Sequence, residues 1–395
     1  MIKEMFKKFT APLIFGILAG CATGQMAPLD HAMNFETAEH PSKVESLWSE
    51  KLQGRITDLS VSANGGVVVV ATAPDPDLET SEYSLRALTH SGKQLWKTQM
   101  QSPVKAQAIS ADGSLLIISN YNDEILGIDQ DGKQLWKSQG MCKPFFLDAA
   151  HKIICYHDDD AESRVAFDVL DYNGNKLSSF PANSDVLSFK ISQDERNAVI
   201  GEVKGQVILL DPEQKLLWQR KVNGEIVDVA VSSGAEPRLA ALFNAGKNGQ
   251  KLAVFDRKGK SMAEKAVGSH VEQIEFSQDG KMVFAYGNGP KGQYLSAMDS
   301  THLNETWHRE DARYADYSSA MLVAGESVVI GFEDVAPNTR HSHLLAFNIE
   351  GKLIWNIPLV TEEGAYLYGQ AFSPATDLLI VGTDDSMLSG YQIGK

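Results

Sequence analysis

The densest set of side chains that could bind a metal lies before the middle of the chain. Residues 157–160 read His-Asp-Asp-Asp, and Glu162 follows closely. Hard cations such as calcium prefer several carboxylate oxygens, but this spacing fits no calcium-loop motif. His341 and His343 form a second candidate, because alternate residues of a strand point to the same side. A closed zinc site needs about four ligands, so we expect no bound metal at either place.

A glycine motif raises the question of phosphate binding. Residues 287–292 read Gly-Asn-Gly-Pro-Lys-Gly and satisfy the pattern G-x-G-x-x-G. A dinucleotide site requires a helix after the glycines, because the pyrophosphate sits at the helix N-terminus. Pro290 interrupts the motif, and the residues that follow, 294–297, are typical of a strand. The sequence therefore predicts a hairpin loop here.

Two of the three cysteines, Cys142 and Cys155, flank a predicted hairpin. The expected strand register places Cys155 opposite Phe145, which leaves Cys142 three residues away along the strand. A disulfide needs Cα atoms within ~7 Å, so a bond would require the register to shift. No Ser-His-Asp set stands out either, and we expect no catalytic residues.

Composition and charge narrow the function classes. The chain has 395 residues with 43% hydrophobic and 22% charged residues, as in a globular protein. Its 36 basic and 51 acidic residues give a net charge of −15, which argues against a nucleic-acid partner.

The N-terminus has the pattern of an export signal. Three lysines lie within the first eight residues, and a mainly apolar run, residues 9–20, follows. A bilayer span needs ~20 apolar residues, so a secretory signal is the better interpretation. The run ends Leu-Ala-Gly-Cys at Cys21, which resembles the lipobox of bacterial lipoproteins. The resemblance implies cleavage before Cys21 and acylation of that cysteine, with palmitate among the acyl groups. The next residue is Ala22 and not aspartate. In this respect the sequence resembles lipoproteins that follow the default route to the outer membrane, and the resemblance implies a protein that faces the periplasm.

The chain thus divides into three predicted parts. Residues 1–20 form a signal peptide, and residues 21–45 form the lipidated cysteine with a flexible tether. Residues 46–395 form one folded domain. No long segment in this last part has a helical period; short β-branched runs alternate with turn residues.

The folded part consists of one sequence repeat that occurs several times. A turn, most often Gly-Lys followed by a strand with tryptophan, recurs in steps of 40 to 48 residues at positions 92, 132, 174, 214, 259, 303 and 351, with Gln214 and Leu303 in place of the glycine. An aspartate precedes several of these turns. Because functional carboxylates are rarely copied into every repeat, we expect these aspartates to hold the turn by bonding backbone amides. They are Asp129, Asp171, Asp211, Asp256 and Asp299.

Four antiparallel strands per repeat indicate an all-β fold, a β-propeller. The last repeat lacks its fourth strand, and residues 46–49 at the other end of the chain could supply it, which would remove two sheet edges. We therefore predict an eight-bladed propeller of four-stranded antiparallel blades, closed by the N-terminal strand, with seven blades as the alternative. The structural tryptophans of the repeat are Trp48, Trp96, Trp136, Trp218, Trp307 and Trp355.

The Asp-x-x-Gly-Lys-x-x-Trp pattern resembles the tryptophan-docking repeat of quinoprotein-type propellers from Trp48 to Lys395. A lipoprotein built almost solely of such blades is similar in architecture to the propeller subunit of the β-barrel outer-membrane assembly machinery. Quinoprotein dehydrogenases would imply a calcium site, a catalytic aspartate and often an adjacent cysteine pair. The chain has no Cys-Cys pair and lacks the large insertions of those enzymes. We expect no enzyme activity and no cofactor.

With catalytic, metal and cofactor sites not expected, the loops on one face of the ring are the remaining candidate for function. Loops between the second and third strands vary greatly in length and should emerge on one face of the ring, whereas those of blades two and four are short. We expect a non-catalytic scaffold that docks envelope proteins there, and the resemblance implies the β-barrel assembly machinery as partner. The alternatives are a small ligand or glycan in the central channel and, less favoured, a quinone-dependent dehydrogenase. The candidate partner-binding residues are Asp75, Asp77, Glu79, Asp158, Asp159, Asp160, Arg340, His341 and His343.

Overall fold

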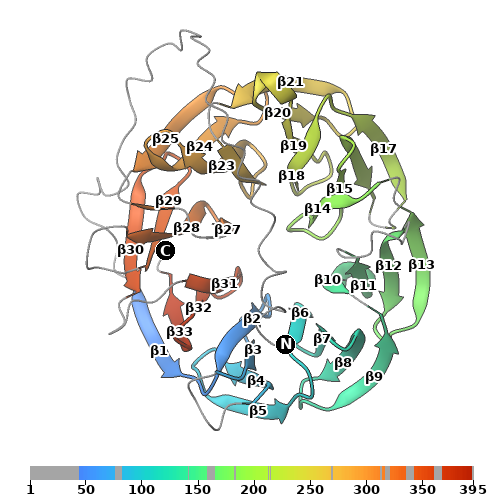
Figure 1. Ribbon diagram of the computed structural model, residues 1–395, viewed down its shortest axis with the longest axis vertical. Helices are drawn as coiled ribbons and strands as arrows, with labels where there is room; N and C mark the ends of the chain where they lie inside the picture. The colour runs from blue at the N-terminus through green and yellow to red at the C-terminus, as the bar shows by residue number, and fades with distance from the viewer. Residues whose placement is uncertain are drawn as a thin grey trace. The chain divides into compact units, whose positions relative to one another are not determined.

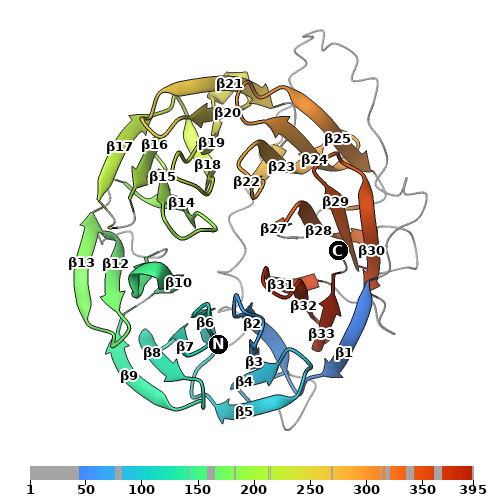
Figure 2. The ribbon, with the colours of Figure 1, turned by 180° about the vertical axis from the view of Figure 1, so that it is seen from behind.

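Eight β-sheets stand around a central axis like the blades of a propeller (Figure 1). The computed structural model describes residues 44–75, 82–140, 142–157, 165–181, 184–211, 213, 215–267, 270–311, 314–315, 321–334, 342–359 and 367–393. Within each blade the first strand lies nearest the axis and the last lies at the perimeter (Figures 1 and 2). The eight sheets confirm the predicted all-β propeller, and the seven-bladed alternative is wrong.

The first four blades each contain four consecutive antiparallel strands. Blade 1 contains β2 (Arg55–Val61), β3 (Val67–Ala73), β4 (Ser84–Thr89) and β5 (Gln94–Gln99). Blade 2 contains β6 (Val104–Ile109), β7 (Leu115–Asn120), β8 (Glu124–Asp129) and β9 (Gln134–Gln139). Blade 3 contains β10 (Lys143–Leu147), the short 3-10 turn η2 (Asp148–Ala150), β11 (Lys152–Tyr156), β12 (Val165–Asp171) and β13 (Lys176–Pro181). Blade 4 contains β14 (Val186–Ile191), β15 (Ala198–Glu202), β16 (Gln206–Leu210) and β17 (Leu216–Lys221).

The last four blades repeat the pattern with two variations. Blade 5 contains β18 (Glu225–Val231), β19 (Leu239–Asn244), the turn η3 (Gly246–Asn248), β20 (Gln250–Phe255) and β21 (Ser261–Val267). Blade 6 contains β22 (His270–Phe276), β23 (Met282–Gly289), β24 (Gly292–Asp299) and β25 (Glu305–Asp311). In blade 7 two short strands, β26 (Tyr314–Ala315) and β27 (Leu322–Ala324), share the inner position beside β28 (Ser327–Asp334), followed by β29 (Ser342–Asn348) and β30 (Leu353–Leu359). Blade 8 contains β31 (Leu367–Ser373), β32 (Leu378–Thr383), β33 (Met387–Gln392) and β1 (Glu45–Lys51).

The N-terminal strand closes the ring as predicted. Strand β1 pairs antiparallel with β33, with Trp48 opposite Gly390 and Lys51 opposite Met387. In both ribbon views β1 lies at the perimeter between β30 and β5 (Figures 1 and 2). The two ends of the described chain therefore share one sheet, and β1 covers the outer edge of β33 that would otherwise be unpaired.

The hydrophobic core lies between blades rather than inside any one of them. The second strands are buried on both faces because a neighbouring blade covers each face; all six residues of β7 are buried, for example. One cluster joins Val69, Leu85 and Ala87 of blade 1 to Ile118 and Leu126 of blade 2. This packing explains why such strands read as continuous apolar runs instead of alternating ones.

The repeated aspartates hold the turns between the third and fourth strands, as predicted. The Asp129 carboxylate accepts hydrogen bonds from the amides of Asp131 (3.0 Å) and Lys133 (2.8 Å). The other repeated aspartates accept equivalent bonds. Gly132 has φ of 81°, a left-handed conformation that favours glycine.

The tryptophans of the fourth strands dock onto these turns in the next blade. The Trp96 indole N–H donates to the carbonyl of Gln130 at 2.9 Å, and its ring covers Gly132, where an added Cβ would come within 2.7 Å of the ring. Four further tryptophans do the same, with acceptors at His90, Tyr172, Arg257 and Ile349. The turn thus needs glycine for two reasons, its backbone angle and the ring above it.

Trp355 departs from this pattern. It is only 1% exposed, yet its Nε1 has no hydrogen-bond partner among the described residues. The reason is topological. In blade 8 the third and fourth strands, β33 and β1, come from opposite ends of the described chain, so no turn joins them within the described residues to supply the acceptor carbonyl.

The predicted register of the blade 3 hairpin is wrong, and the error decides the state of the cysteines. Cys155 pairs with Pro144, one residue from the expected Phe145. A one-residue shift moves every side chain to the other face, so Cys155 points to the same side as residue 144 and therefore as residue 142. Cys142 and Cys155 form a disulfide with a Cα–Cα distance of 4.7 Å.

Candidate functional site: the loop face of the ring

One face of the ring is held together by hydrogen bonds between neighbouring hairpin tips. The Asn64 amide N–H of blade 1 donates to the Ala111 carbonyl of blade 2, and Ala111 in turn donates to the Asp148 carboxylate of blade 3. Asp148 donates its own backbone N–H to Glu195 of blade 4 at 2.6 Å. Further bonds join blade 4 to blade 5 and blade 8 to blade 1. The tryptophan-docked turns lie on this same side, which we call the tied face.

The opposite face carries the loops between second and third strands, and we call it the loop face. Between the described second and third strands lie residues 74–83 in blade 1, 157–164 in blade 3 and 335–341 in blade 7, most of which are outside the described part of the chain. The described connections of blades 2 and 4 are short, as predicted, and span only residues 121–123 and 203–205. In blade 6, β23 and β24 pair as far as Gly289 and Gly292 and leave a two-residue turn. The glycine motif is therefore a hairpin, as predicted.

Most of the candidate partner-binding residues lie outside the part of the chain that the structure describes. They are Asp77, Glu79, Asp158, Asp159, Asp160, Arg340 and His341, and Cys21 lies outside it as well.

Two candidates are described and lie in different blades. Asp75 follows β3 in blade 1, with its Oδ1 3.7 Å from Nε of Arg55. His343 is in β29 of blade 7, with Nδ1 3.0 Å from Oδ1 of Asn356. Their neighbours differ, so the structure does not bring them into one site. The described residues contain no group of His, Cys, Asp or Glu arranged to hold a metal ion.

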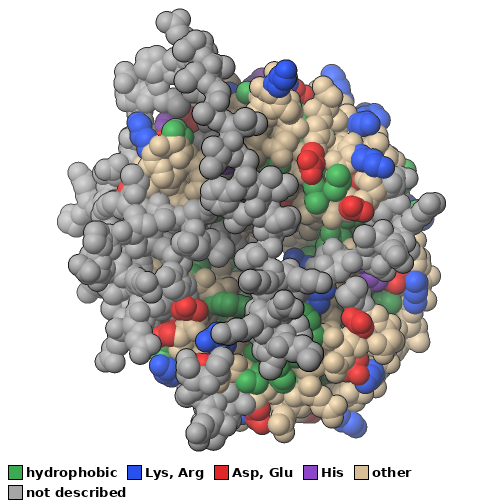
Figure 3. All heavy atoms as spheres, in the orientation of Figure 1, with side chains coloured by type: hydrophobic (Ala, Val, Ile, Leu, Met, Phe, Trp, Pro, Cys, Tyr) green, Lys and Arg blue, Asp and Glu red, His purple; other side chains and the backbone are tan. Residues whose placement is uncertain are grey.

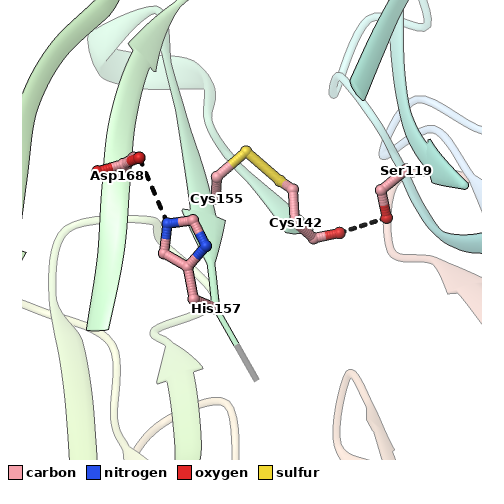
Figure 4. The surroundings of a disulfide bond; sticks show 5 residues. All are labelled: Ser119, Cys142, Cys155, His157 and Asp168. Atoms are coloured by element: carbon pink, nitrogen blue, oxygen red, sulfur yellow. Dashed lines mark hydrogen bonds and ion pairs between the residues drawn. A yellow bond between two sulfur atoms is a disulfide. The ribbon is translucent and has the colours of Figure 1, made fainter. Parts of the chain in front are cut away.

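Several side-chain contacts and a disulfide brace the described base of the blade 3 loop (Figure 4). His157 precedes the loop and lies 3.3 Å from the Asp168 carboxylate. The Asp168 carboxylate also forms an ion pair with Lys176 at 2.8 Å and accepts a hydrogen bond from the Ser179 hydroxyl at 2.6 Å. Burial works in the opposite direction, but these partners hold the pKa of Asp168 below its usual value.

The disulfide braces the other side of the same loop base. The Ser119 hydroxyl of blade 2 donates to the Cys142 carbonyl, while Cys155 lies two residues before His157 (Figure 4). Both cysteines are at most 2% exposed. The disulfide therefore fixes the end of β11 relative to β10 and, through Ser119, to blade 2.

The inner strands carry buried and partly buried ionisable groups that sequence analysis missed. Asp58 in blade 1 accepts hydrogen bonds from the amides of Leu59 and, across the junction, Gln107 of blade 2. Burial raises the pKa of Asp58 to about 7, against the opposing effect of those amides and of Lys143. Asp228 occupies the same place in blade 5 and accepts from Ile274 of blade 6 at 2.9 Å.

A bulge in each inner strand explains these aspartates. Register shifts occur between Ile56 and Asp58 and between Ile226 and Asp228. The shift turns the aspartate toward the next blade's inner strand. In the same region Lys190 of β14 forms an ion pair with Glu275 of β22, reaching past blade 5. Both aspartates stand out in the sequence because uncharged residues flank them. Without the strand register, however, the direction of their side chains could not be predicted.

The visible face of the molecule shows no single charged patch. In Figure 3 basic and acidic side chains are interspersed over the described part of that face. None of the described segments is a helix long and apolar enough to span a bilayer.

Comparisons with known proteins agree with this architecture. The family model described as outer membrane protein assembly factor BamB matches residues 42–159 and 161–373. Among solved structures, BamB from Moraxella catarrhalis is 16% identical, with a TM-score of 0.61 over 89% of this chain and 100% of that one. The β-propeller domain of Cps50 (Swd1) from Myceliophteria thermophila is 11% identical, with a TM-score of 0.54 over 89% of this chain and all of that chain. The C-terminal WD40 domain of Sif2 is also 11% identical, with a TM-score of 0.65 over 90% of this chain and all of that chain. A search of curated proteins finds no match.

Proposed function

Because the chain belongs to the family of the outer membrane protein assembly factor BamB, we propose that it is a non-catalytic scaffold that binds protein partners in outer-membrane protein assembly. The observation that carries this proposal is the contrast between the two faces of the ring. Hydrogen bonds between neighbouring hairpin tips fix the tied face from blade 8 through blade 5. On the loop face, the number of residues between the second and third strands differs from blade to blade. Rigid scaffolds commonly present their binding residues on such variable loops.

The proposed location is the periplasmic side of the outer membrane, with a lipid anchor at Cys21. The lipobox-like sequence before Cys21 supports the anchor. The disulfide supports an oxidising compartment, because such bonds persist in the periplasm and are rare in the cytosol. Several acyl chains on one cysteine would anchor the protein stably, since each buried CH₂ contributes ~0.8 kcal/mol.

The proposal of a non-catalytic role rests on what the ionisable groups of the inner strands do. Asp58, Asp228 and the Lys190–Glu275 pair join inner strands of different blades. Each is engaged by backbone amides or an opposite charge, so these groups act in holding the ring. An activity assay with added quinone and calcium tests this point, and dye-linked turnover would contradict it.

The direct test is co-purification from cross-linked membranes, with mass spectrometry of the proteins recovered. We compare wild type with Cys21→Ala and with a loop-face triple variant, Asp75→Asn, Asp77→Asn and Glu79→Gln. A matched control removes the same charge from tied-face turns through Asp131→Asn, Glu213→Gln and Glu350→Gln. We expect outer-membrane assembly components with wild type and the control, and several-fold less with the loop-face variant. Equal recovery from both triple variants, or no partner at all, would contradict the scaffold.

A further inference from the structure

A cleft at the seam of the ring contains more cationic than anionic groups. It lies between the closing strand β1 and blade 1 and has a volume of about 270 Å³. Its charged lining residues are Glu50, Lys51, Arg86 and Lys97, in a chain whose net charge is −15. Small-molecule pockets usually measure ~300–1,000 Å³, so this cleft suits one side chain better than a whole ligand.

Arg86 is the residue that sets this cleft apart from the rest of the ring. In the other blades with a fourth-strand tryptophan, the residue one before the tryptophan's partner is uncharged: Leu126, Ile208, Ser296, Leu345 and Ser389. Blade 1 therefore places a guanidinium, with its side chain 13% exposed, where several blades place an aliphatic side chain. A buried charge of this kind is costly unless its donors are satisfied.

The donors of Arg86 are not all satisfied. Both contacts to Glu50, at 3.0 and 3.2 Å, come from the single nitrogen Nη2. Nε has no hydrogen-bond partner among the described residues. Glu50 is itself 41% exposed and can swing away from the cleft. The pair thus occupies only part of a group that forms two parallel bonds with a carboxylate when it is fully engaged.

Hydroxyl and ammonium groups of the cleft add further donors. The hydroxyls of Thr72 and Ser84 hydrogen-bond to each other at 2.8 Å, which uses one O–H and leaves the second free to donate. Lys51 has no ion-pair partner in the described part of the chain, whereas Lys97 pairs with Glu82 at 3.1 Å. Thr72 and Ser84 flank the blade 1 loop, so the cleft belongs to the loop face.

From this arrangement we infer that the seam cleft binds a carboxylate presented by a protein partner, the side chain of a glutamate or aspartate. The inference rests on the proposed scaffold function and names the chemistry of its partner. The incoming carboxylate displaces Glu50 from Arg86 and takes a further bond from the free hydroxyl. No bond is made or broken covalently.

The test uses full-length purified protein and two short probes, the peptides Ac-Gly-Glu-Gly-NH₂ and Ac-Gly-Gln-Gly-NH₂, observed by saturation-transfer NMR. We expect saturable binding of the glutamate peptide and none of its amide counterpart. Arg86→Leu, which restores the residue type of other blades, should weaken binding at least about tenfold, since charged hydrogen bonds commonly contribute that much. Glu50→Gln should tighten binding several-fold, because the competing carboxylate is gone while Arg86 remains.

The opposite directions of the two variants separate a binding site from a purely structural ion pair. A structural pair would lower the melting temperature in both variants and leave peptide binding absent or unchanged. Equal responses to both peptides, or binding of inorganic phosphate in place of the peptide, would overturn the inference. If the glutamate peptide binds as expected but membranes yield no partner, the scaffold proposal fails and the carboxylate site stands.

Discussion

Blades 1 and 2 meet in a different way from blades 3 and 4. At the first junction the core is aliphatic, and Trp96 closes the perimeter by docking onto the next turn. At the second junction Ser178 stands at the tryptophan position, opposite Val169. Aromatic rings fill the interior instead, with Phe167 stacked on Phe180 at 5.2 Å and 5.5 Å from Phe189. The same gap between blades can thus be filled from the outside by one indole or from the inside by several phenyl rings.

The contrast has a consequence for stability. A docked tryptophan is partly exposed and combines apolar contact with one hydrogen bond, whereas the phenyl cluster gains nearly all its energy from burial. Blade 3 adds the Asp148–Glu195 contact to its aromatic junction with blade 4, whereas its disulfide lies in the cluster that blade 3 shares with blade 2. We therefore expect the two junctions to respond differently to truncation and to pH, and blade 3 to respond to reduction.

Truncation of the aromatic core should have the largest effect. Phe167 is fully buried, and Phe167→Ala should lower the free energy of unfolding by about 3–5 kcal/mol through lost burial and the cavity left behind. Leu85 is the equivalent residue of blade 1 and is also fully buried, so Leu85→Ala is the matched control. Urea unfolding followed by circular dichroism gives both values. A smaller loss for Phe167→Ala than for Leu85→Ala would contradict the assignment of the aromatic cluster as the main support of its junction.

Loss of the disulfide should also have a large effect. The bond closes a loop with a sequence separation of 13, for which the loop-entropy argument gives about 3 kcal/mol. We expect the Cys142→Ser, Cys155→Ser double variant to unfold at a lower urea concentration, and dithiothreitol to lower the stability of wild type but not of the variant. Limited proteolysis should then cut first near residues 157–164. Cleavage first in blade 1 would show that the bond does not brace the blade 3 loop.

The pattern of success and failure in the sequence predictions follows the same division. The repeat period, the turn aspartates and the closing strand could be predicted because each depends on local sequence copied several times. The disulfide could not be predicted, because it depends on the exact register of the blade 3 hairpin. An error of one residue, as at Cys155 and Pro144, moves the side chain to the opposite face of the sheet. Asp58 and Arg86 were missed because their hydrogen-bond partners belong to a neighbouring blade. No local sequence pattern specifies such contacts.

The pH dependence of stability should reside at the tryptophan-docked junction. Burial raises the pKa of Asp58 to about 7, so the folded protein holds a proton that the unfolded chain releases near pH 4. The folded state therefore binds more protons between about pH 4 and 7, and stability falls as the pH rises through that window. Asp58→Asn should flatten this part of the profile by up to about 4 kcal/mol, the value of a difference of about three pKa units. An unchanged profile in the variant would assign the dependence to other groups.

The smallest expected effect concerns the indole N–H itself, and its sign is the informative part. Trp218 donates to the Arg257 carbonyl at 2.9 Å, whereas the buried Nε1 of Trp355 has no partner in the described structure. Replacing each in turn with benzothienylalanine exchanges the N–H for sulfur and keeps the ring shape. At position 218 the change should destabilise by about 1 kcal/mol, the usual net value of a hydrogen bond. At position 355 it should be neutral or stabilising, because it removes a buried donor that had no acceptor. Equal losses at both positions would mean that an acceptor reaches Trp355 after all, and that the missing turn of blade 8 is replaced by another part of the chain.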